Sequence, residues 1–480
     1  MPSPSDSFSV DAACAWFGVD RALCARVLAA ALDRGGDYAD LYFQHRRACS
    51  IHLEDGLISH ASTSVDRGVG IRVVRGDQTG YAYSEDLELE PILHAAKTAA
   101  AIAAGNRAVE PPGFGLRLSP DLYPIAEGWD QIELSRKLPL LSRIEGLAHA
   151  RESAIVKVSV GWADADERVL VATSTGELRA DRRPMSRIGL TLTAKRGDEV
   201  QSGGSNIAGR RGLDWYDAGR LDELVRDAVD RTMILFEAVR PPAGEMPVVL
   251  AAGASGILLH EAIGHGMEAD FNRKGVSIYA RMLGERVAAE CVTVVDSALH
   301  PYERGALNFD DEASEVERTV LVDGGILRSY LHDRISARHY GVASTGSGRR
   351  ESFRHVPMPR MRCTYMENGP HAREEIIASV SRGILAETFS NGQVQIGAGD
   401  FTFYIKNGWL IEGGRLTAPI KDVNIIGNGP QALRDVTMVA NDLKLDTGGW
   451  TCGKDGQSVP VSQGMPTALV SKLTVGGRHA

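Results

Sequence analysis

Hydrophobic and polar positions in the first half of the chain follow two different periods, one helical and one strand-like. Apolar residues three or four apart predict a helix, whereas alternation at every second residue predicts a strand. Gly35 and Gly36 end the first helical stretch, and Gly-containing turns separate the strand-like ones. In chain order the pattern predicts a helix over 21–33, strands in 41–45 and 51–53, a hairpin from 69–74 to 79–83, and a helix over 87–103.

The same order of elements recurs about 120 residues further along the chain. Gly56 corresponds to Gly176, an offset of 120 residues, and Asp77 corresponds to Asp198, an offset of 121. Strand-like stretches lie around these second turns, at 170–174 and 188–194, and a helical stretch follows at 220–237. We therefore predict a duplicated unit of antiparallel strands followed by a helix. The alternative is a chance likeness between two hairpins, because Gly-Asp turns are common.

A stiff Pro-Gly break, Arg240-Pro241-Pro242-Ala243-Gly244, is the strongest candidate boundary in the chain. Beyond it strand-like runs dominate, separated by turn signals that include Asn391-Gly392, Asn407-Gly408 and Gly413-Gly414. We expect an α+β protein of two domains. Residues 1–239 should form an N-terminal domain of antiparallel strands and helices, and residues 245–480 a mostly antiparallel sheet or barrel that carries at least one helix.

Composition and charge narrow the range of functions. The chain has 480 residues, of which 43% are hydrophobic and 24% charged, with a net charge of −9. An acidic net charge argues against sequence-independent binding of nucleic acid, which needs a basic surface. The N-terminal segment 1–7 is polar and lacks the pattern of a signal peptide, and the most apolar stretch, 248–259, is too short to span a bilayer. We expect a cytoplasmic protein without membrane segments whose six cysteines are reduced.

The motif with the clearest chemistry follows the predicted boundary. It reads His260-Glu261-Ala262-Ile263-Gly264-His265, one residue longer than the HExxH pattern of zinc peptidases. On a regular α-helix five residues at about 100° each would place the two histidines about 140° apart, so both could not face one metal. Gly264 and Gly266 flank the second histidine, and we expect a π-bulge or a helix end there to realign it. The alternative is a buried core histidine followed by a histidine in a loop.

A catalytic zinc usually has three protein ligands and an open position, so one ligand remains to be identified. Glu268 and Asp270 are close in the sequence, and further histidines lie downstream at 300, 332, 339, 355 and 371. Cys452 lies in the glycine-rich segment 448–456, which could present a thiolate to a metal, and the neighbouring Lys454 would favour that thiolate. Spacing alone does not choose among these residues.

Several segments resemble the TldD/PmbA family of zinc peptidases. The likeness extends over nearly the whole chain and covers segments 39–44, 260–266, 268–275, 344–352, 452–461 and 473–477. The resemblance implies that His260, His265 and Cys452 hold zinc and that Glu261 is the catalytic general base. It also implies a sister subunit of the TldE or PmbA type, which shares the fold but lacks the metal motif. The implied substrates are unfolded or extended peptides, as in the maturation of peptide natural products or the removal of antitoxins.

Two other functions remain open at this stage. A non-enzymatic regulatory protein could use zinc structurally while it modulates a DNA-associated partner, but structural zinc sites usually have four protein ligands. A metal-dependent amidase acting on small molecules would need a closed pocket rather than a long cleft. The arginines at 349, 350, 354 and 360 could bind a peptide, but we interpret them as a solvated or inter-subunit loop because charge runs are mostly solvated.

Overall fold

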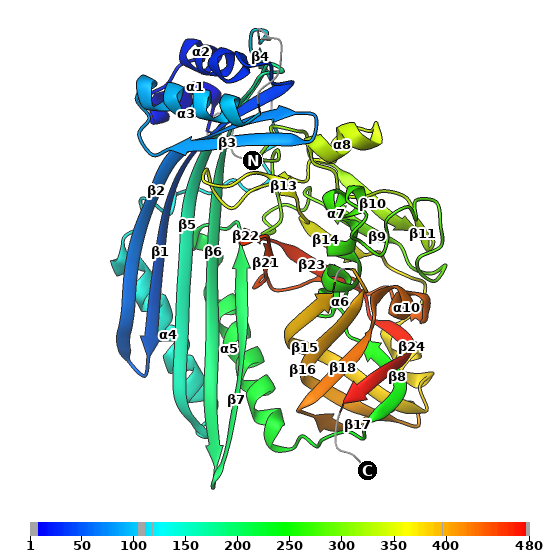
Figure 1. Cartoon of the computed structure of the whole chain (residues 1–480). Helices are drawn as coiled ribbons and strands as arrows, with labels where there is room; N and C mark the ends of the chain where they lie inside the picture. Colours follow the sequence, from blue (N-terminus) through cyan, green and yellow to red (C-terminus); the bar gives the residue numbers. More distant parts are fainter. Residues whose placement is uncertain (1–7, 104–110, 118, 396, 477–480) are drawn as a thin grey trace.

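The computed structural model describes residues 8–103, 111–117, 119–395 and 397–476 (Figure 1). The polar segment 1–7, on which the expectation of no signal peptide partly rests, and Gly477 of the C-terminal signature lie outside the described residues. In the described ranges no helix is both long and apolar enough to cross a membrane.

One seven-stranded sheet contains every strand that the structure describes in the first half of the chain. Its order is β3-β2-β1-β5-β6, with β7 and the short β4 also paired to β6. The long strands are antiparallel to their neighbours, and β4 alone runs parallel to its partner. The bounds are β1 (Tyr38–Glu54), β2 (Leu57–Arg75), β3 (Gln78–Ser84), β4 (Gly115–Leu116), β5 (Ile155–Thr173), β6 (Glu177–Arg196) and β7 (Glu199–Gly209).

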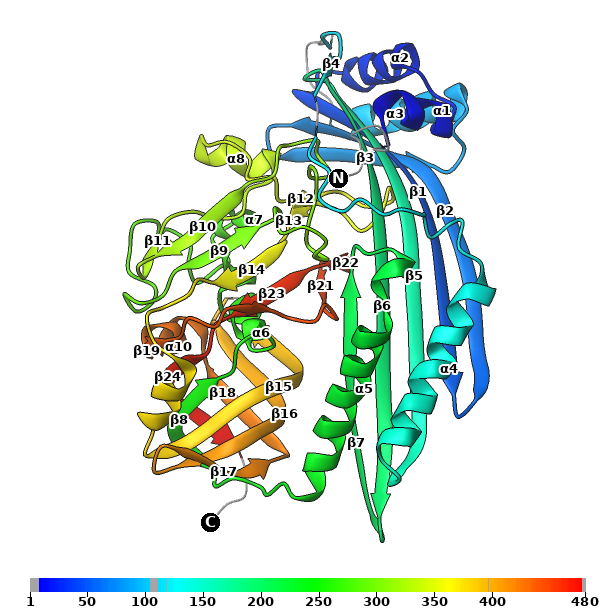
Figure 2. The ribbon, with the colours of Figure 1, turned by 180° about the vertical axis from the view of Figure 1, so that it is seen from behind.

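Two groups of helices pack on this sheet, one near each end (Figures 1 and 2). The first group is α1 (Val10–Phe17), α2 (Arg21–Leu32) and α3 (Leu89–Ile102), and the second is α4 (Leu134–Arg151) and α5 (Ala218–Met233). Leu41 and Phe43 of β1 join the core beneath the first group, and Ile51 and Leu53 join the core beneath the second. All four have odd numbers, so both groups cover one face of the sheet. The two strands predicted at 41–45 and 51–53 are therefore one continuous strand, β1. The polar residues between them lie where β1 passes from one group of helices to the other.

The predicted repetition of elements is present in the structure. Strands β1, β2 and β3 are followed by α3, and strands β5, β6 and β7 are followed by α5. The turns correspond as well, because Gly56 and Gly176 both have positive φ, as do Gly76 and Gly197. Glycine reaches this conformation without the steric penalty of a Cβ atom.

The second half of the chain forms two larger, mostly antiparallel sheets, where the turn-rich pattern predicted a mostly antiparallel sheet or barrel. A six-stranded sheet has the order β11-β10-β9-β14-β23-β20, and a second sheet has the order β15-β8-β24-β18-β16-β17. An additional pairing of β15 with β16 closes five strands of the second sheet into a ring. Most pairs are antiparallel; β14 with β23 and β15 with β8 are parallel.

The elements of this half are mostly short. The strands are β8 (Gly244–Leu250), β9 (Val294–Ser297), β10 (Arg318–Asp323), β11 (Ile326–Leu327), β12 (Gly348–Arg349), β13 (Met358–Pro359), β14 (Cys363–Met366), β15 (Arg382–Gln395), β16 (Asp400–Glu412), β17 (Arg415–Ile420), β18 (Val423–Asn428), β19 (Val436–Val439), β20 (Lys444–Leu445), β21 (Thr451–Lys454), β22 (Gln457–Pro460), β23 (Ser462–Met465) and β24 (Ala468–Gly476). The helices are α6 (Gly256–Leu259), α7 (Ala269–Arg273), α8 (Arg334–Tyr340), α9 (Arg373–Ala378) and α10 (Gly429–Arg434).

Two predicted turns in this half are wrong, because Asn391-Gly392 lies inside β15 and Asn407-Gly408 inside β16. Both glycines are needed for close packing. A Cβ on Gly392 would lie 2.2 Å from the Phe403 ring, and one on Gly408 would lie 2.3 Å from the Leu385 carbonyl oxygen. A glycine that allows such close approach cannot be distinguished from a turn glycine by sequence alone. The predicted turn at Gly413-Gly414 is confirmed, and both residues have positive φ.

The two halves meet through a buried cluster and buried ion pairs. Tyr42 on the sheet packs with Phe309 and Phe353 of the second half. Beside them Arg350 contacts Asp40 at 3.1 Å, and both side chains are fully buried. The interpretation of the arginine stretch as a solvated loop is therefore wrong for Arg350, and also for Arg349 and Arg360, which are buried too.

Candidate metal centre

The helix that carries the two histidines changes its winding where the sequence predicted. After α6 it continues as a π-helix over His260–Gly264 and then as a short 3₁₀ turn over His265–Met267. The backbone N–H of His265 donates to the carbonyl oxygen of His260, five residues back. This bond defines a π turn, and it places the second histidine over the first instead of far around the helix. The predicted helix distortion is confirmed.

The glycines of the motif have a different role from the one expected. Gly264 has ordinary helical dihedrals, with φ −57° and ψ −55°, so its backbone does not require glycine. A Cβ at Gly264 would lie 2.0 Å from Met361 Sδ, and one at Gly266 would lie 2.6 Å from the Tyr279 ring. The glycines therefore provide space for neighbouring side chains to pack against the distorted helix.

The third candidate ligand comes from a hairpin nearly two hundred residues further along the chain. Cys452 lies on β21, which pairs with β22 across a turn at Asp455 and Gly456. Both turn residues have positive φ, 49° and 75°. Asp-Gly is a favoured sequence for a two-residue hairpin turn of this kind, and its twist suits two short strands.

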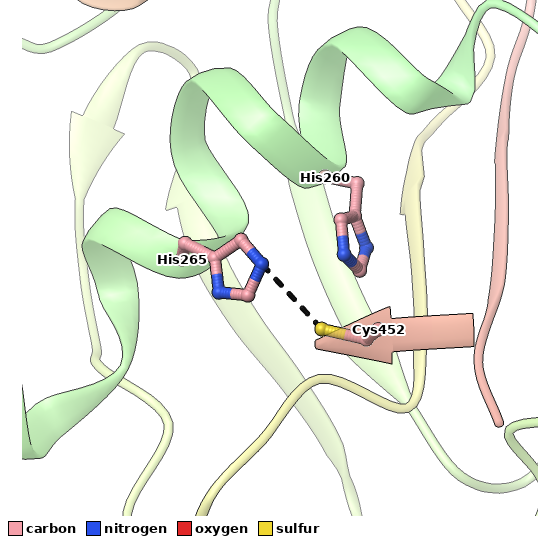
Figure 3. Close-up of side chains that lie close together, drawn as sticks. All are labelled: His260, His265 and Cys452. Carbon is pink, nitrogen blue, oxygen red and sulfur yellow. Dashed lines mark hydrogen bonds between the residues drawn. The ribbon is translucent and has the colours of Figure 1, made fainter. Parts of the chain in front are cut away.

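His260, His265 and Cys452 converge in the folded chain (Figure 3). Their potential ligand atoms all lie within 4.8 Å of one another, and all three residues are buried. The imidazole rings are 5.0 Å apart at an angle of 82°, and Cys452 Sγ is 3.4 Å from His265 Nε2. Within the described part of the chain this is the one group of three or more His, Cys, Asp or Glu side chains close enough to share a metal ion.

Electrostatics in the cluster favour a thiolate. Burial alone would raise the pKa of the Cys452 thiol, but the charge of His260 and hydrogen bonds from His260 and His265 lower it to about 4. Conversely, burial would lower the pKa of His265, but the Glu268 carboxylate and Cys452 raise it well above its usual value. The two histidines, rather than Lys454, account for the shift of the thiol.

Glu268 and Asp270, considered above as ligands, form a layer outside the cluster. Glu268 Oε2 accepts a hydrogen bond from His265 Nδ1 at 3.0 Å and lies 3.2 Å from Lys454 Nζ. Asp270 binds the same ammonium group at 2.7 Å. A carboxylate on the far nitrogen of a ligating histidine fixes its tautomer and orientation. With a metal in the cluster, this contact would keep the proton of His265 on Nδ1 and leave Nε2 free to bind the ion.

The donor set fits a zinc ion. Two imidazoles and one thiolate are a combination found in catalytic zinc sites, which have three protein ligands. His260 Nδ1 is buried and has no hydrogen-bond partner among the described residues. The downstream histidines at 300, 332, 339, 355 and 371 are not members of the cluster.

The cluster opens on a cavity of about 430 Å³. Glu261, half-buried and next to the first ligand in the sequence, lines this cavity with the three cluster residues. The other lining residues are Ile257, Phe271, Gln393, Val394, Trp450, Thr451, Gly453, Lys454, Asp455, Val461 and Gln463. Sequence reasoning missed the contribution of β15 and β23, since Gln393 and Gln463 lie in no recognisable motif.

Three domain models of one protein family match this chain. The models of the PmbA/TldA metallopeptidase family match as domain 1 over residues 39–103, as the central domain over 127–236 and as the C-terminal domain over 243–477. The first two matches cover the two copies of the strand-helix unit described above.

A relative and two solved structures extend over almost the whole chain. The Metalloprotease TldD homolog of Haemophilus influenzae is 40% identical over 454 residues, which cover 93% of this chain and 94% of that protein. The Thermotoga maritima structure described as a proposed modulator of a DNA gyrase has a TM-score of 0.78 at 21% identity and covers 95% of this chain and 99% of its own. TldE from Thermococcus kodakarensis has a TM-score of 0.72 at 20% identity and covers 92% and 97%.

At these identities the two structures demonstrate the shared fold, whereas the family models and the sequence relative establish kinship. This chain belongs to the PmbA/TldD family of metallopeptidases.

Proposed function

We propose that this chain is a zinc-dependent peptidase that cleaves unfolded or extended peptides. The observation that carries the proposal is the buried group of His260, His265 and Cys452, which opens on a cavity that Glu261 also lines. Three donors beside a cavity match a catalytic zinc site, in which one coordination position stays available. Zinc is favoured over magnesium or calcium, because those ions prefer oxygen ligands and this set offers nitrogen and sulfur.

In this proposal His260, His265 and Cys452 hold the metal, and Glu261 is the general base. Bound zinc would supply a Lewis acid for the scissile carbonyl and for the attacking water. Glu261 accepts the proton of that water and passes it to the leaving amine. Glu268 keeps His265 in the tautomer whose free lone pair faces the cluster, at the 3.0 Å contact described above.

The walls of the cavity support an extended polypeptide as substrate. Thr451 and Gly453 line it from β21, and Gln393 and Val394 line it from β15. Within the described residues β21 pairs with β22 alone, so its other edge is free for main-chain hydrogen bonds. Strand addition of this kind recognises the backbone and tolerates many side chains. The cleavage of peptide natural-product precursors, antitoxins or other labile peptides in the cytoplasm is consistent with such low selectivity.

A sister subunit of the TldE or PmbA type is the proposed partner. The similarity to a solved TldE structure over 92% of this chain supports the idea that two related folds combine. The long sheet also leaves an edge uncovered, since residues 57–65 of β2 are exposed and β3 pairs with β2 only from Val69 onward. Open strand edges invite pairing with another chain.

A second candidate is a regulatory protein with structural zinc that modulates a DNA-associated partner. The fold shared with the Thermotoga maritima protein favours it. A structural zinc site, however, usually has four protein ligands, and three are close together in the described residues. A small-molecule amidase is disfavoured by the cavity, because β21 borders it with an unpaired edge suited to an extended chain.

The test is a cleavage assay on an unstructured peptide, with the chain purified together with its genomic sister subunit. We expect cleavage that a chelator abolishes and added zinc restores. Cleavage that persists in a verified metal-free preparation would contradict the proposal. Restored zinc binding without cleavage of any unstructured peptide would favour the regulatory alternative.

A further inference from the structure

The ligands of the candidate centre come from two elements that are far apart in the sequence. The distorted helix supplies both histidines, and the β21–β22 hairpin supplies Cys452. A two-stranded hairpin is at most marginally stable by itself, so other contacts must fix the position of its thiol. Lys454, on the same strand, makes such contacts with the segment that follows the histidines.

Lys454 lies two residues after Cys452 on the same strand. Side chains two apart on a strand point to the same face, and residues 452 and 454 are both buried while 451 and 453 are exposed. The face that presents the thiol to the histidines therefore also presents the ammonium group to the segment that follows them.

The ammonium group of Lys454 is fully occupied at this place. It binds Asp270 Oδ1 at 2.7 Å, Glu268 Oε2 at 3.2 Å and the Pro359 carbonyl oxygen at 3.1 Å. An ammonium group has three N–H donors, so each has an acceptor. The Lys454 side chain is 2% exposed, which leaves little access for a substrate. Lys454 therefore forms a buried ion-pair link between the hairpin and the segment that follows the histidines.

Glu268 links Lys454 to His265, the histidine that contacts the Cys452 thiol. The same oxygen, Oε2, receives both His265 Nδ1 and Lys454 Nζ. Glu268 is completely buried, and a buried carboxylate needs a compensating charge to remain ionised. Lys454 provides that charge directly, and Arg360 Nε lies 3.9 Å from the other oxygen, Oε1. Arg360 also donates to the Cys452 carbonyl oxygen, so it holds the hairpin backbone from the same side.

We propose that Lys454 and Glu268 form a buried ionic clasp that couples the hairpin to the distorted helix, so that Cys452 meets the two histidines only when the clasp is closed. Both are positioning residues, since they act through Cys452 and His265. The inference rests on the proposed metal site and adds a condition for its assembly. Loss of the clasp should weaken the sulfur ligand first, because the histidines remain on one continuous helical segment.

The test uses the full chain and two metals, zinc and cobalt(II). Lys454→Met removes the charge at nearly constant length, and Glu268→Gln keeps an acceptor for His265 but removes the charge that Lys454 needs. We expect each variant to lose about 10- to 100-fold in zinc affinity, as second-sphere changes do. We also expect a weaker thiolate-to-cobalt charge-transfer absorption in Lys454→Met, which reports the sulfur ligand specifically.

Lys472→Met is the matched control, because Lys472 forms an exposed ion pair with Glu245 at 2.8 Å, and it should bind both metals like the wild type. Wild-type affinity together with a full-strength sulfur band in Lys454→Met would overturn the clasp. If circular dichroism shows that Lys454→Met does not fold, the double variant with Glu268→Gln decides by the same two readouts, since it has no buried carboxylate at position 268 that needs a compensating charge. A wild-type chain that takes up neither metal would contradict the proposed function itself, and the clasp with it.

Discussion

At the scale of single residues, the candidate centre combines groups with opposite tendencies. Burial raises the pKa of a thiol, yet the neighbouring histidines lower the pKa of Cys452 to about 4. Cys24 has no such neighbours, and burial raises its pKa to about 12. Cys24 and Cys452 are thus buried thiols of opposite character, and the arrangement around Cys452 is the one that suits a metal ligand.

Substitution of the thiol should therefore remove the metal. We expect Cys452→Ala to lose both zinc and peptide cleavage, because two histidines alone leave the ion without its third protein ligand. Metal analysis after gel filtration and a cleavage assay check this. Cys291→Ala, which alters an exposed thiol, is the control and should keep both properties. Wild-type zinc content in Cys452→Ala would exclude the cysteine as a ligand.

How much of this centre the sequence could predict depends on the distance between its parts. The two histidines and the helix distortion follow from local spacing, because a five-residue separation is incompatible with one face of a regular helix. Cys452 was predicted from the family resemblance alone. It lies 192 residues after His260, and no spacing rule connects two residues so far apart. The partners of Lys454 were not predicted, because salt bridges between remote segments leave no periodic signal.

At the scale of elements, the hairpin with Cys452 is held from two directions. The clasp fixes it to the distorted helix, and the preceding glycine segment lies against β7 of the long sheet. Ala208 on β7 donates its N–H to the Thr447 carbonyl oxygen at 2.9 Å. A Cβ on Gly448 would lie 2.6 Å from the Ala208 carbonyl oxygen. The first half of the chain therefore contributes to the position of a candidate ligand in the second half.

Two glycines with the same backbone angle allow this contact to be tested. Gly448 and Gly456 both have φ +75°, but a Cβ on Gly456 would meet nothing within 4 Å. We expect Gly456→Ala to lose only the stability associated with a left-handed residue, on the order of 1 kcal/mol. Gly448→Ala should in addition displace the segment that leads to Cys452 and lower zinc affinity. Thermal unfolding and zinc titration measure the two effects, and equal zinc affinity in both variants would contradict the role of β7.

At the scale of the whole molecule, the repeated strand-helix units form a broad sheet, and the second half carries the site (Figure 2). The repetition was predictable because its turns need glycine at corresponding positions. The buried positions of Arg349, Arg350 and Arg360 were not, because a run of arginines looks the same in a solvated loop and in a buried ionic network. Asp40 and Asp311, the partners of Arg350, come from other segments of the sequence.

The proposed partnership leads to a prediction about assembly. We expect weak or absent peptidase activity for this chain alone and activity on unfolded peptides once the sister subunit is added. A cavity shared by two chains would admit extended polypeptide and exclude folded proteins. Cleavage rates for an unstructured peptide and for a folded protein, measured with and without the partner, check this. Full activity of the isolated chain, or ready digestion of the folded protein, would contradict it.

In the proposed function the metal is catalytic, and Glu261 accepts the proton of the attacking water without holding the ion. The most direct test is zinc content and peptide cleavage measured side by side in Glu261→Gln, purified with the sister subunit. We predict zinc content equal to that of the wild type and cleavage slower by about 10²- to 10⁴-fold, the usual contribution of a general base. Wild-type cleavage by this variant would contradict the account, as would loss of the zinc, since Glu261 would then be a ligand.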